Sequence, residues 1–295
     1  MRTVQLINYG RGGSLRTKQA LHWGVDHTWH RRQPLPLVHR VFLTHPDLPE
    51  AFHGLTVAQV SDLHAGQFMP PGRLEQVRQV LERLAADLVV FTGDQLDRRA
   101  VDAEIFVQAF AGIKAPLGVF GILGNHDHQA GSQLAIWALE AAGITPLLNA
   151  AVAIHRHGQA IEIVGVDDIE APAPGGPDFS LLQPRKSQFR LLLCHQPRLW
   201  FEAVRYGAEV TLAGHTHGGQ IAVVGPKLTL ARLQSRYVAG LYASGSHLLY
   251  VSRGLGVGAF PWRLGSPPEV DCLTLCRRPG AAANQGSVST DPAQG

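Results

Sequence analysis

Eight short apolar runs between residues 55 and 276 constrain the fold of this chain more than any other feature. Runs of this length are typical of buried strands. Between them, 72–87 and 100–113 have apolar residues at helical spacing, and Ser132 is expected to begin a third helix that Gly143 ends. Alternating strands and helices indicate an α/β sandwich, and the strand-rich last third indicates a sheet completed by hairpins. The eight runs span residues 55–61, 87–93, 118–124, 160–166, 189–195, 209–215, 247–253 and 270–276.

Positive charge is concentrated at the N-terminus. The net charge of the whole chain is +3, yet residues 1–40 contain seven Arg or Lys and a single acidic residue, Asp26. The rest of the chain is therefore mildly acidic, and its sequence lacks the clustered Lys and Arg of a nucleic-acid groove, so no nucleic-acid partner is expected. We predict a basic arm at 1–40, a folded domain at 41–276 and a disordered tail at 277–295.

The sequence also bears on where the protein works. No apolar stretch approaches the roughly 18 residues that cross a bilayer, and the N-terminus has no hydrophobic run of the kind found in signal peptides. Cys194, Cys272 and Cys276 are an odd number without metal-ligand spacing, so reduced thiols are expected. We expect a soluble, cytoplasmic protein, with peripheral contact between the basic arm and the inner membrane as an open alternative.

Potential metal ligands follow five of the apolar runs. In an α/β sheet the crevice lies beyond the carboxyl ends of the strands, so such residues converge there. Residues at i and i+2 of an extended segment point to the same side, so both can reach one ion. The mixture of oxygen and imidazole donors suits transition metals, and two ions that share one carboxylate would use the whole set. The motifs are Asp62 with His64, Asp94, Asn125 with His126 and Asp127, His195, and His215 with His217.

The ordered motifs D-x-H, GD, GNHD, H and GHTHGGQ resemble those of the calcineurin-like metallophosphoesterases. The longer segments GHTHGGQI (214–221), VSRGLG (251–256) and PPEVDCLTL (267–275) resemble the bacterial branch with small phosphodiesterases and UDP-2,3-diacylglucosamine pyrophosphatases. The resemblance covers about residues 38–276. It implies a four-layer α-β-β-α sandwich of two mixed sheets, with a dinuclear metal site at the carboxyl ends of the strands.

The resemblance also implies two divalent transition-metal ions, Mn, Fe or Zn, bridged by Asp94 and a hydroxide. Such a pair of ions supplies hydroxide near neutral pH and holds the phosphate oxygens for in-line attack. Asp62, His64 and His217 would complete the first site, and Asn125, His195 and His215 the second.

By the same resemblance, His126 would donate a proton to the leaving oxygen. Asp127 is expected to hold the other nitrogen of its ring, as a carboxylate beside a working imidazole usually does. The alternative for His126 is a bystander in a crowded loop. His128, Arg253 and Arg263 are weaker predictions for contact with an anionic substrate, and a packing or solvated role is the equal alternative for the two arginines.

Four residues near the motifs have two interpretations each. Asp97 either orients a ligand or caps the following helix. Asp167 and Asp168 could reach the cleft, although a solvated turn is favoured for both. Cys194 is favoured as a buried structural thiol over a ligand.

Substrate specificity should reside in two loops, 170–188 and 254–266. In the second loop, Val257, Phe260 and Trp262 could dock an acyl chain or a membrane surface. The alternative is that these side chains pack on the sandwich.

We therefore predict a phosphoesterase that hydrolyses a small phosphodiester or a pyrophosphate. A UDP-2,3-diacylglucosamine hydrolase of lipid A synthesis, with a nucleotide-lipid substrate, is the alternative in the same class. A binding scaffold with a phosphoesterase fold and no activity is the alternative of another class, and the complete ligand set with His126 argues against it. A nuclease is disfavoured because the body is acidic and has no basic, aromatic stripe.

Overall fold

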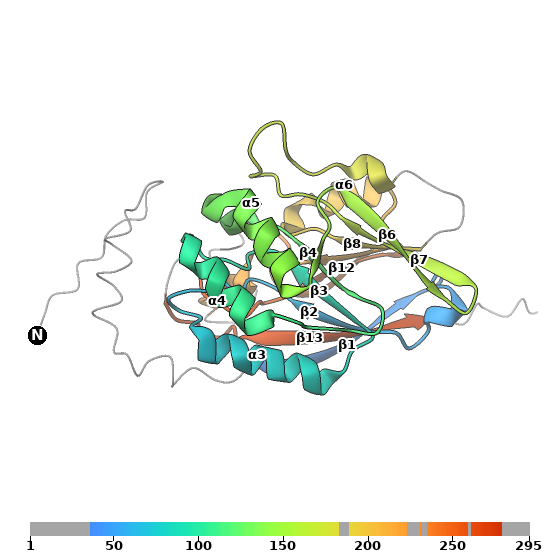
Figure 1. Ribbon diagram of the computed structural model, residues 1–295. Helices are drawn as coiled ribbons and strands as arrows, with labels where there is room; N and C mark the ends of the chain where they lie inside the picture. The colour runs from blue at the N-terminus through green and yellow to red at the C-terminus, as the bar shows by residue number, and fades with distance from the viewer. Residues whose placement is uncertain (1–35, 183–188, 223–230, 232–234, 259–260, 279–295) are drawn as a thin grey trace, which may run out of the picture.

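The computed structural model describes residues 36–182, 189–222, 231, 235–258 and 261–278 (Figure 1). Two six-stranded sheets form its centre. The first sheet has the order β1 (Leu37–His45), β13 (Glu269–Arg277), β2 (Thr56–Val60), β3 (Leu88–Thr92), β4 (Val119–Ile122) and β5 (Thr145–Pro146). The second has the order β11 (Gly240–Ser244), β12 (His247–Val251), β9 (Val210–Ala213), β8 (Phe189–Leu193), β7 (Gln159–Gly165) and β6 (Ala150–Arg156).

Both sheets are mixed. In the first sheet β2 to β5 run parallel, and β13 lies antiparallel to β2 while it pairs in parallel with β1. In the second sheet β7, β8, β9 and β12 run parallel, and the edge strands β6 and β11 are antiparallel to their neighbours. The β11–β12 pair is a hairpin in the last third of the chain, as predicted.

Helices cover the outer faces of both sheets (Figure 1). The first sheet is covered by α3, α4 and α5, and the second by α6 and a short 3-10 segment, η2. Within α3, Leu74, Val77 and Leu81 lie on one face at helical spacing and are buried against the sheet. The helices are α3 (Pro71–Leu84), α4 (Ala100–Phe110), α5 (Asn125–Ala142) and α6 (Trp200–Arg205), and the 3-10 segments are η1 (Glu50–Phe52), η2 (Phe179–Leu182), η3 (Pro197–Leu199) and η4 (His217–Gly219).

Three buried apolar layers hold these elements together, one between the two sheets and one under each helical layer. Strand alternation assigns side chains to the layers: Val57 points between the sheets, whereas the next residue, Ala58, packs under the helices. The predicted four-layer α-β-β-α sandwich is confirmed.

Each predicted strand is present, and α3 and α4 match their predicted segments. The third helix is α5, which begins at Asn125 and is interrupted at Gly131, where φ is 124°. Ser132 is the first residue after this interruption, so a helical piece starts there as predicted, and Gly143, with φ 85°, ends it. The helical piece before the interruption, which starts at Asn125, is not predicted.

The predicted domain limits fall mainly outside the described residues. Residues 37–40 of the predicted arm belong to β1, so the sheet begins before residue 41. Residues 1–35 and 279–295, which make up most of the arm and the tail, lie outside the description. Among the described helices, none combines the length and the apolar character needed to span a membrane.

Candidate metal centre

The predicted metal ligands meet where β2, β3, β4, β8 and β9 end. Backbone hydrogen bonds tie the strand ends together: the Asp62 amide donates to the Gly93 carbonyl at 3.0 Å, and the Gly214 amide donates to the His195 carbonyl at 3.0 Å. The first bond links two strands of one sheet, and the second links two strands of the other. The loops that carry the ligands are thus anchored at their starting points, and the ligands are almost all buried.

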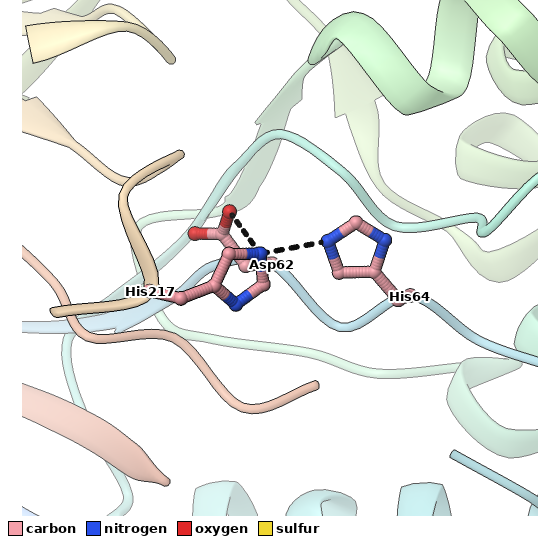
Figure 2. A group of neighbouring side chains, drawn as sticks. All are labelled: Asp62, His64 and His217. Atoms are coloured by element: carbon pink, nitrogen blue, oxygen red, sulfur yellow. Dashed lines mark hydrogen bonds and ion pairs between the residues drawn. The ribbon is translucent and has the colours of Figure 1, made fainter. Parts of the chain in front are cut away.

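One group of ligand atoms comes from Asp62, His64 and His217 (Figure 2). The Nε2 atoms of His64 and His217 are 3.1 Å apart, and His217 Nε2 lies 3.6 Å from Asp62 Oδ1. Ligand atoms about 2.1 Å from an ion lie about 3.0–3.4 Å apart in octahedral or tetrahedral geometry. The spacing therefore fits a metal ion between these side chains.

A second group of ligand atoms comes from Asp94, His195 and His215, with Asn125 beside them. His195 Nδ1 donates to the Thr92 carbonyl at 2.8 Å, so Nε2 is the ring nitrogen left for a metal. This buried Nε2 has no hydrogen-bond partner and lies 3.3 Å from Asp94 Oδ2. Asn125 Oδ1 lies 3.0 Å from His215 Nδ1. A buried ring nitrogen without a hydrogen-bond partner fits a metal ligand.

Asp94 is a member of the second group and also lies next to His64 of the first group. The same oxygen, Oδ2, lies 3.6 Å from His64 Nε2 and 3.3 Å from His195 Nε2. The other oxygen, Oδ1, accepts a hydrogen bond of 2.8 Å from the His126 amide, which fixes the orientation of the carboxylate. This placement is suited to a carboxylate shared by two ions.

The backbone at the site adopts conformations that ordinary residues rarely occupy. The left-handed region costs a non-glycine residue about 1–3 kcal/mol, and such residues cluster at functional sites. No strand or helix pattern in the sequence signals these conformations. Five of the seven predicted ligands lie in that region: Asp62 (φ 52°), His64 (φ 47°), Asp94 (φ 57°), His215 (φ 71°) and His217 (φ 51°).

Two glycines of the sequence motifs lie where the ligand loops approach each other closely. A Cβ atom on Gly124 would overlap Asp94 Oδ1 and lie 2.6 Å from the Asp94 amide nitrogen. A Cβ atom on Gly214 would overlap the side chains of Ser61 and Asp62. Both positions therefore need glycine so that the ligand loops can pack against each other.

Burial sets the protonation of several ligands. It lowers the pKa of His64 and of His217 well below the ordinary value, and it lowers the pKa of His215 to about 4. Burial alone would raise the pKa of Asp94, but His195 and His126 hold that pKa well below its usual range. Neutral imidazoles and an ionised carboxylate are the forms that bind metals.

His126 lies beside the two groups and is held by Asp97. Its Nδ1 donates to the Asp97 carbonyl at 3.1 Å and lies 3.6 Å from Asp97 Oδ1, and its ring packs edge-on against His64. Burial alone would lower the pKa of His126, but the carboxylates of Asp94 and Asp97 outweigh burial and raise that pKa. With Nδ1 engaged, Nε2 is the ring atom available for proton transfer.

The predicted contact between Asp127 and the His126 ring is wrong. The Asp127 carboxylate accepts hydrogen bonds from the amides of Gly124 (2.9 Å), Leu96 (2.9 Å) and Gln95 (3.3 Å). Asp127 occupies the third position of α5, where a carboxylate caps the helix, so it secures the ligand loops and does not reach the ring.

The cap interpretation of Asp97 is also wrong. Arg99 precedes the first turn of α4, and Asp102 accepts the hydrogen bonds there, including 2.8 Å from the Arg99 amide. Asp97 Oδ1 instead lies 3.8 Å from His64 Nδ1. Asp97 therefore adjoins the rings of both a predicted ligand and the predicted proton donor.

The three predicted substrate contacts have partners within the protein. His128 forms an ion pair with Asp167 at 2.8 Å. Arg253 pairs with Glu269, which is buried. Arg263 donates to the carbonyls of Gly256 (2.7 Å) and Arg253 (2.8 Å), and its Nη2 lies 3.1 Å from His217 Nδ1. Contact of these residues with substrate stays a prediction.

Of the remaining predictions, one is wrong and one is confirmed. The solvated turn favoured for Asp167 and Asp168 is wrong, because Asp167 pairs with His128, and Asp168 is buried and accepts 2.8 Å from Gln196 Nε2. The buried thiol at Cys194 is confirmed, and burial raises the pKa of that thiol to about 12.

Replacing Asp97 with asparagine is expected to lower kcat about tenfold, because the loss of one charged partner of His126 corresponds to about 1.4 kcal/mol. The number of bound metal ions should not change. The measurement is steady-state turnover of an aryl phosphodiester, together with metal analysis. Asp87→Asn is the control, since the Asp87 carboxylate accepts hydrogen bonds from the amide and the hydroxyl of Thr56 at the opposite end of the sheet. An unchanged kcat in Asp97→Asn would contradict a role of Asp97 in positioning His126.

Comparison with known proteins gives one family. The sequence model described as "Calcineurin-like phosphoesterase" matches residues 55–219. An "Uncharacterized metallophosphoesterase" of Aquifex aeolicus is 35% identical over 75% of this chain and 85% of its own length. "Phosphodiesterase YaeI" of Escherichia coli is 32% identical over 73% of this chain and 80% of its own length. "UDP-2,3-diacylglucosamine pyrophosphatase LpxG" of Chlamydia trachomatis is 29% identical over 82% of this chain and 90% of its own length.

Proposed function

The chain belongs to the calcineurin-like phosphoesterases and is a metallophosphoesterase, and from that premise we propose that it hydrolyses a phosphodiester or a pyrophosphate. One observation carries the proposal. Asp94 Oδ2 lies between two groups of buried ligand atoms, 3.6 Å from His64 Nε2 and 3.3 Å from His195 Nε2. This arrangement supports two adjoining metal sites that share one carboxylate.

The ligands divide between the two sites. In this proposal one ion is held by Asp94 with Asp62, His64 and His217, and the other by Asp94 with Asn125, His195 and His215. Two such ions, when bound, lower the pKa of a water molecule and stabilise the charge that develops on the phosphate oxygens. The donor set of imidazole, carboxylate and amide groups suits Mn, Fe or Zn.

The remaining step belongs to His126. When water adds to phosphorus and the bond to the leaving oxygen breaks, that oxygen needs a proton, and His126 Nε2 is placed to donate it. The opposite ring nitrogen, His126 Nδ1, donates a 3.1 Å hydrogen bond to the backbone carbonyl of Asp97. Asp127 acts on the framework, because it fixes the loops that carry Asp94 and Asn125.

The names of two relatives support the substrate class. One is named a phosphodiesterase and the other a UDP-2,3-diacylglucosamine pyrophosphatase. The pyrophosphatase aligns with 82% of this chain, and this extent of similarity favours hydrolysis of UDP-2,3-diacylglucosamine as the second proposed function. In both reactions water attacks a phosphorus atom, so both need the same pair of metal sites.

Removal of metal is expected to abolish turnover and its return to restore it. The purified chain, treated with a chelator and dialysed, should not hydrolyse bis(p-nitrophenyl) phosphate, and Mn²⁺ should restore activity with about two ions per chain. The measurement is release of p-nitrophenolate together with metal analysis. Parallel assays with UDP-2,3-diacylglucosamine separate the two substrates. A chain that binds no metal and stays inactive in Mn²⁺ would support the binding scaffold instead.

A further inference from the structure

Arg263 connects the loop 254–266 to the metal centre. Elsewhere in this loop Val257 is buried, Trp262 is exposed, and Phe260 lies outside the described residues. Arg263 turns inward, and its Nη2 lies 3.1 Å from Nδ1 of His217, a proposed metal ligand. The loop that the sequence predicts to set specificity therefore also contacts a metal-binding side chain.

Backbone carbonyls hold the guanidinium group of Arg263 in place. Its Nε donates to the Gly256 carbonyl at 2.7 Å, and its Nη1 donates to the Arg253 carbonyl at 2.8 Å. Nη1 also lies 3.3 Å and 3.4 Å from the carbonyls of Ser266 and His217. The Ser266 hydroxyl donates to the same His217 carbonyl at 2.7 Å. Arg263 thus contacts both the backbone and the ring of His217, and its Nη2 is fixed against the ring.

This contact determines which nitrogen of the His217 ring carries hydrogen. A guanidinium group has five N–H donors and no acceptor, so His217 Nδ1 accepts the hydrogen bond from Arg263 and carries no hydrogen itself. The hydrogen of the neutral ring is therefore on Nε2. Nε2 lies 3.1 Å from His64 Nε2 and 3.6 Å from Asp62 Oδ1, as Figure 2 shows. The hydrogen thus occupies the ring position that faces the other ligands.

His195 of the second group has the opposite surroundings. Its Nδ1 donates to the Thr92 carbonyl at 2.8 Å, and its Nε2 has no hydrogen-bond partner. A metal-binding histidine almost always donates its other N–H to a carbonyl or carboxylate group or to water, which makes the ring a stronger ligand. His217 departs from this pattern. For His217 to bind an ion through Nε2, the hydrogen there must leave, or Arg263 must turn away from Nδ1, and both changes oppose binding.

We propose that Arg263 is a positioning residue that makes the two metal sites unequal. It weakens the site that contains His217 relative to the site that contains His195. The positive charge of the guanidinium group acts in the same direction, because it repels a cation bound to the adjoining ring. The site with His195 should therefore fill first, and the site with His217 should exchange its ion more readily. This inference rests on the proposed function, because it concerns the same pair of metal sites.

The test is stepwise binding of Mn²⁺ to the full chain after removal of metal with a chelator, measured by equilibrium dialysis. The unaltered chain should bind two ions whose dissociation constants differ at least about tenfold, since contacts of metal ligands change affinity by about 10- to 100-fold. Arg263→Gln offers an amide oxygen that can accept from Nδ1, so the weaker binding should become about tenfold tighter and the tighter binding should stay unchanged. His217→Gln should remove the weaker ion and keep the tighter one.

Arg190→Gln is the matched control. Arg190 also donates to backbone carbonyls, those of Leu182 and Gly207, but it lies near the start of β8, at the opposite end of the strand from the site. Its variant should bind both ions as the unaltered chain does. Arg263→Lys keeps a group that can only donate, so it should preserve the unequal affinities. Circular dichroism checks that each variant is folded.

A second measurement needs no variant of Arg263, so it is decisive even if Arg263→Gln does not fold. Proton–nitrogen correlation NMR of the metal-free chain, labelled with ¹⁵N-histidine, distinguishes rings with hydrogen on Nε2 from rings with hydrogen on Nδ1. The signal that disappears in His217→Gln identifies His217. We expect its hydrogen on Nε2, whereas a ring without the arginine contact is free to carry it on Nδ1.

The proposal is overturned if the two ions bind equally, if folded Arg263→Gln does not tighten the weaker binding, if His217→Gln removes the tighter ion, or if His217 carries its hydrogen on Nδ1. Turnover of bis(p-nitrophenyl) phosphate at saturating Mn²⁺ reports separately on the proposed function. Equal binding with turnover contradicts only the role of Arg263. A chain that neither binds Mn²⁺ nor turns over the diester contradicts the proposed function and this inference together.

Discussion

Asp94→Asn is expected to lower turnover at least about a thousandfold, equivalent to ~4 kcal/mol, and to leave the chain with fewer than two tightly bound metal ions. The reason is that one oxygen of Asp94 lies within 3.6 Å of ligand atoms from both groups. The amide keeps the shape of the carboxylate and removes the negative charge that two cations would share. Loss at one residue should therefore weaken both sites together.

The measurements are metal analysis after dialysis and kcat/KM for bis(p-nitrophenyl) phosphate over a range of Mn²⁺ concentrations. Asp102→Asn is the matched control, because Asp102 is also a buried aspartate but accepts hydrogen bonds from Arg99 in the first turn of α4. That control can lower stability without changing the metal content. Two tightly bound ions and full activity in Asp94→Asn would contradict the shared-carboxylate assignment.

His126→Asn is expected to lower kcat about 10²- to 10⁴-fold while the chain keeps its metal ions. Because His126 is proposed to protonate the leaving oxygen, the loss should depend on the leaving group. A p-nitrophenolate leaves readily without a proton, so its diester should show the smaller loss. An alkyl diester, whose alkoxide is a poor leaving group, should show the larger one. Steady-state kinetics on the two diesters measures this difference.

His247→Asn is the control for that experiment. His247 resembles His126 in its surroundings, because it is half-buried and its Nδ1 bonds to a backbone carbonyl, that of Ala208, at 2.6 Å. It lies at the start of β12, at the opposite end of the strand from the site. Equal losses on both diesters in His126→Asn, or a loss of metal ions, would show that His126 holds the site together and does not transfer a proton.

The sequence predicts those strands that are buried on both faces. β3 and β8 are buried at every position and are mainly apolar, with Thr92 and Arg190 as their polar residues. β1, β6 and β11 are edge strands with exposed residues on one face, and their mixed sequences conceal them. In β1, polar His39 and Arg40 lie among apolar residues, so the sequence pattern does not show that residues 37–40 belong to a strand and not to the arm.

For the site, too, the sequence predicts one part and not the other. The ligands are predictable because parallel strands bring their carboxyl ends to one edge, whatever separates them along the chain. The contacts of His126 are not predictable from the sequence, because adjacent residues of a helix point in different directions. Asp127 is its neighbour in sequence yet faces backbone amides, and Asp97, which comes from the loop after β3, reaches the ring.

The left-handed backbone at five of the ligands has a consequence for the order in which the protein is made. An unfolded chain does not hold these residues in such conformations, so the ligands become a cage only after both sheets have anchored the loops. A nascent chain therefore lacks this cage during synthesis. If the sites hold metal as proposed, we expect the ions to bind after the fold has formed, so the metal bound would be one supplied to the finished fold.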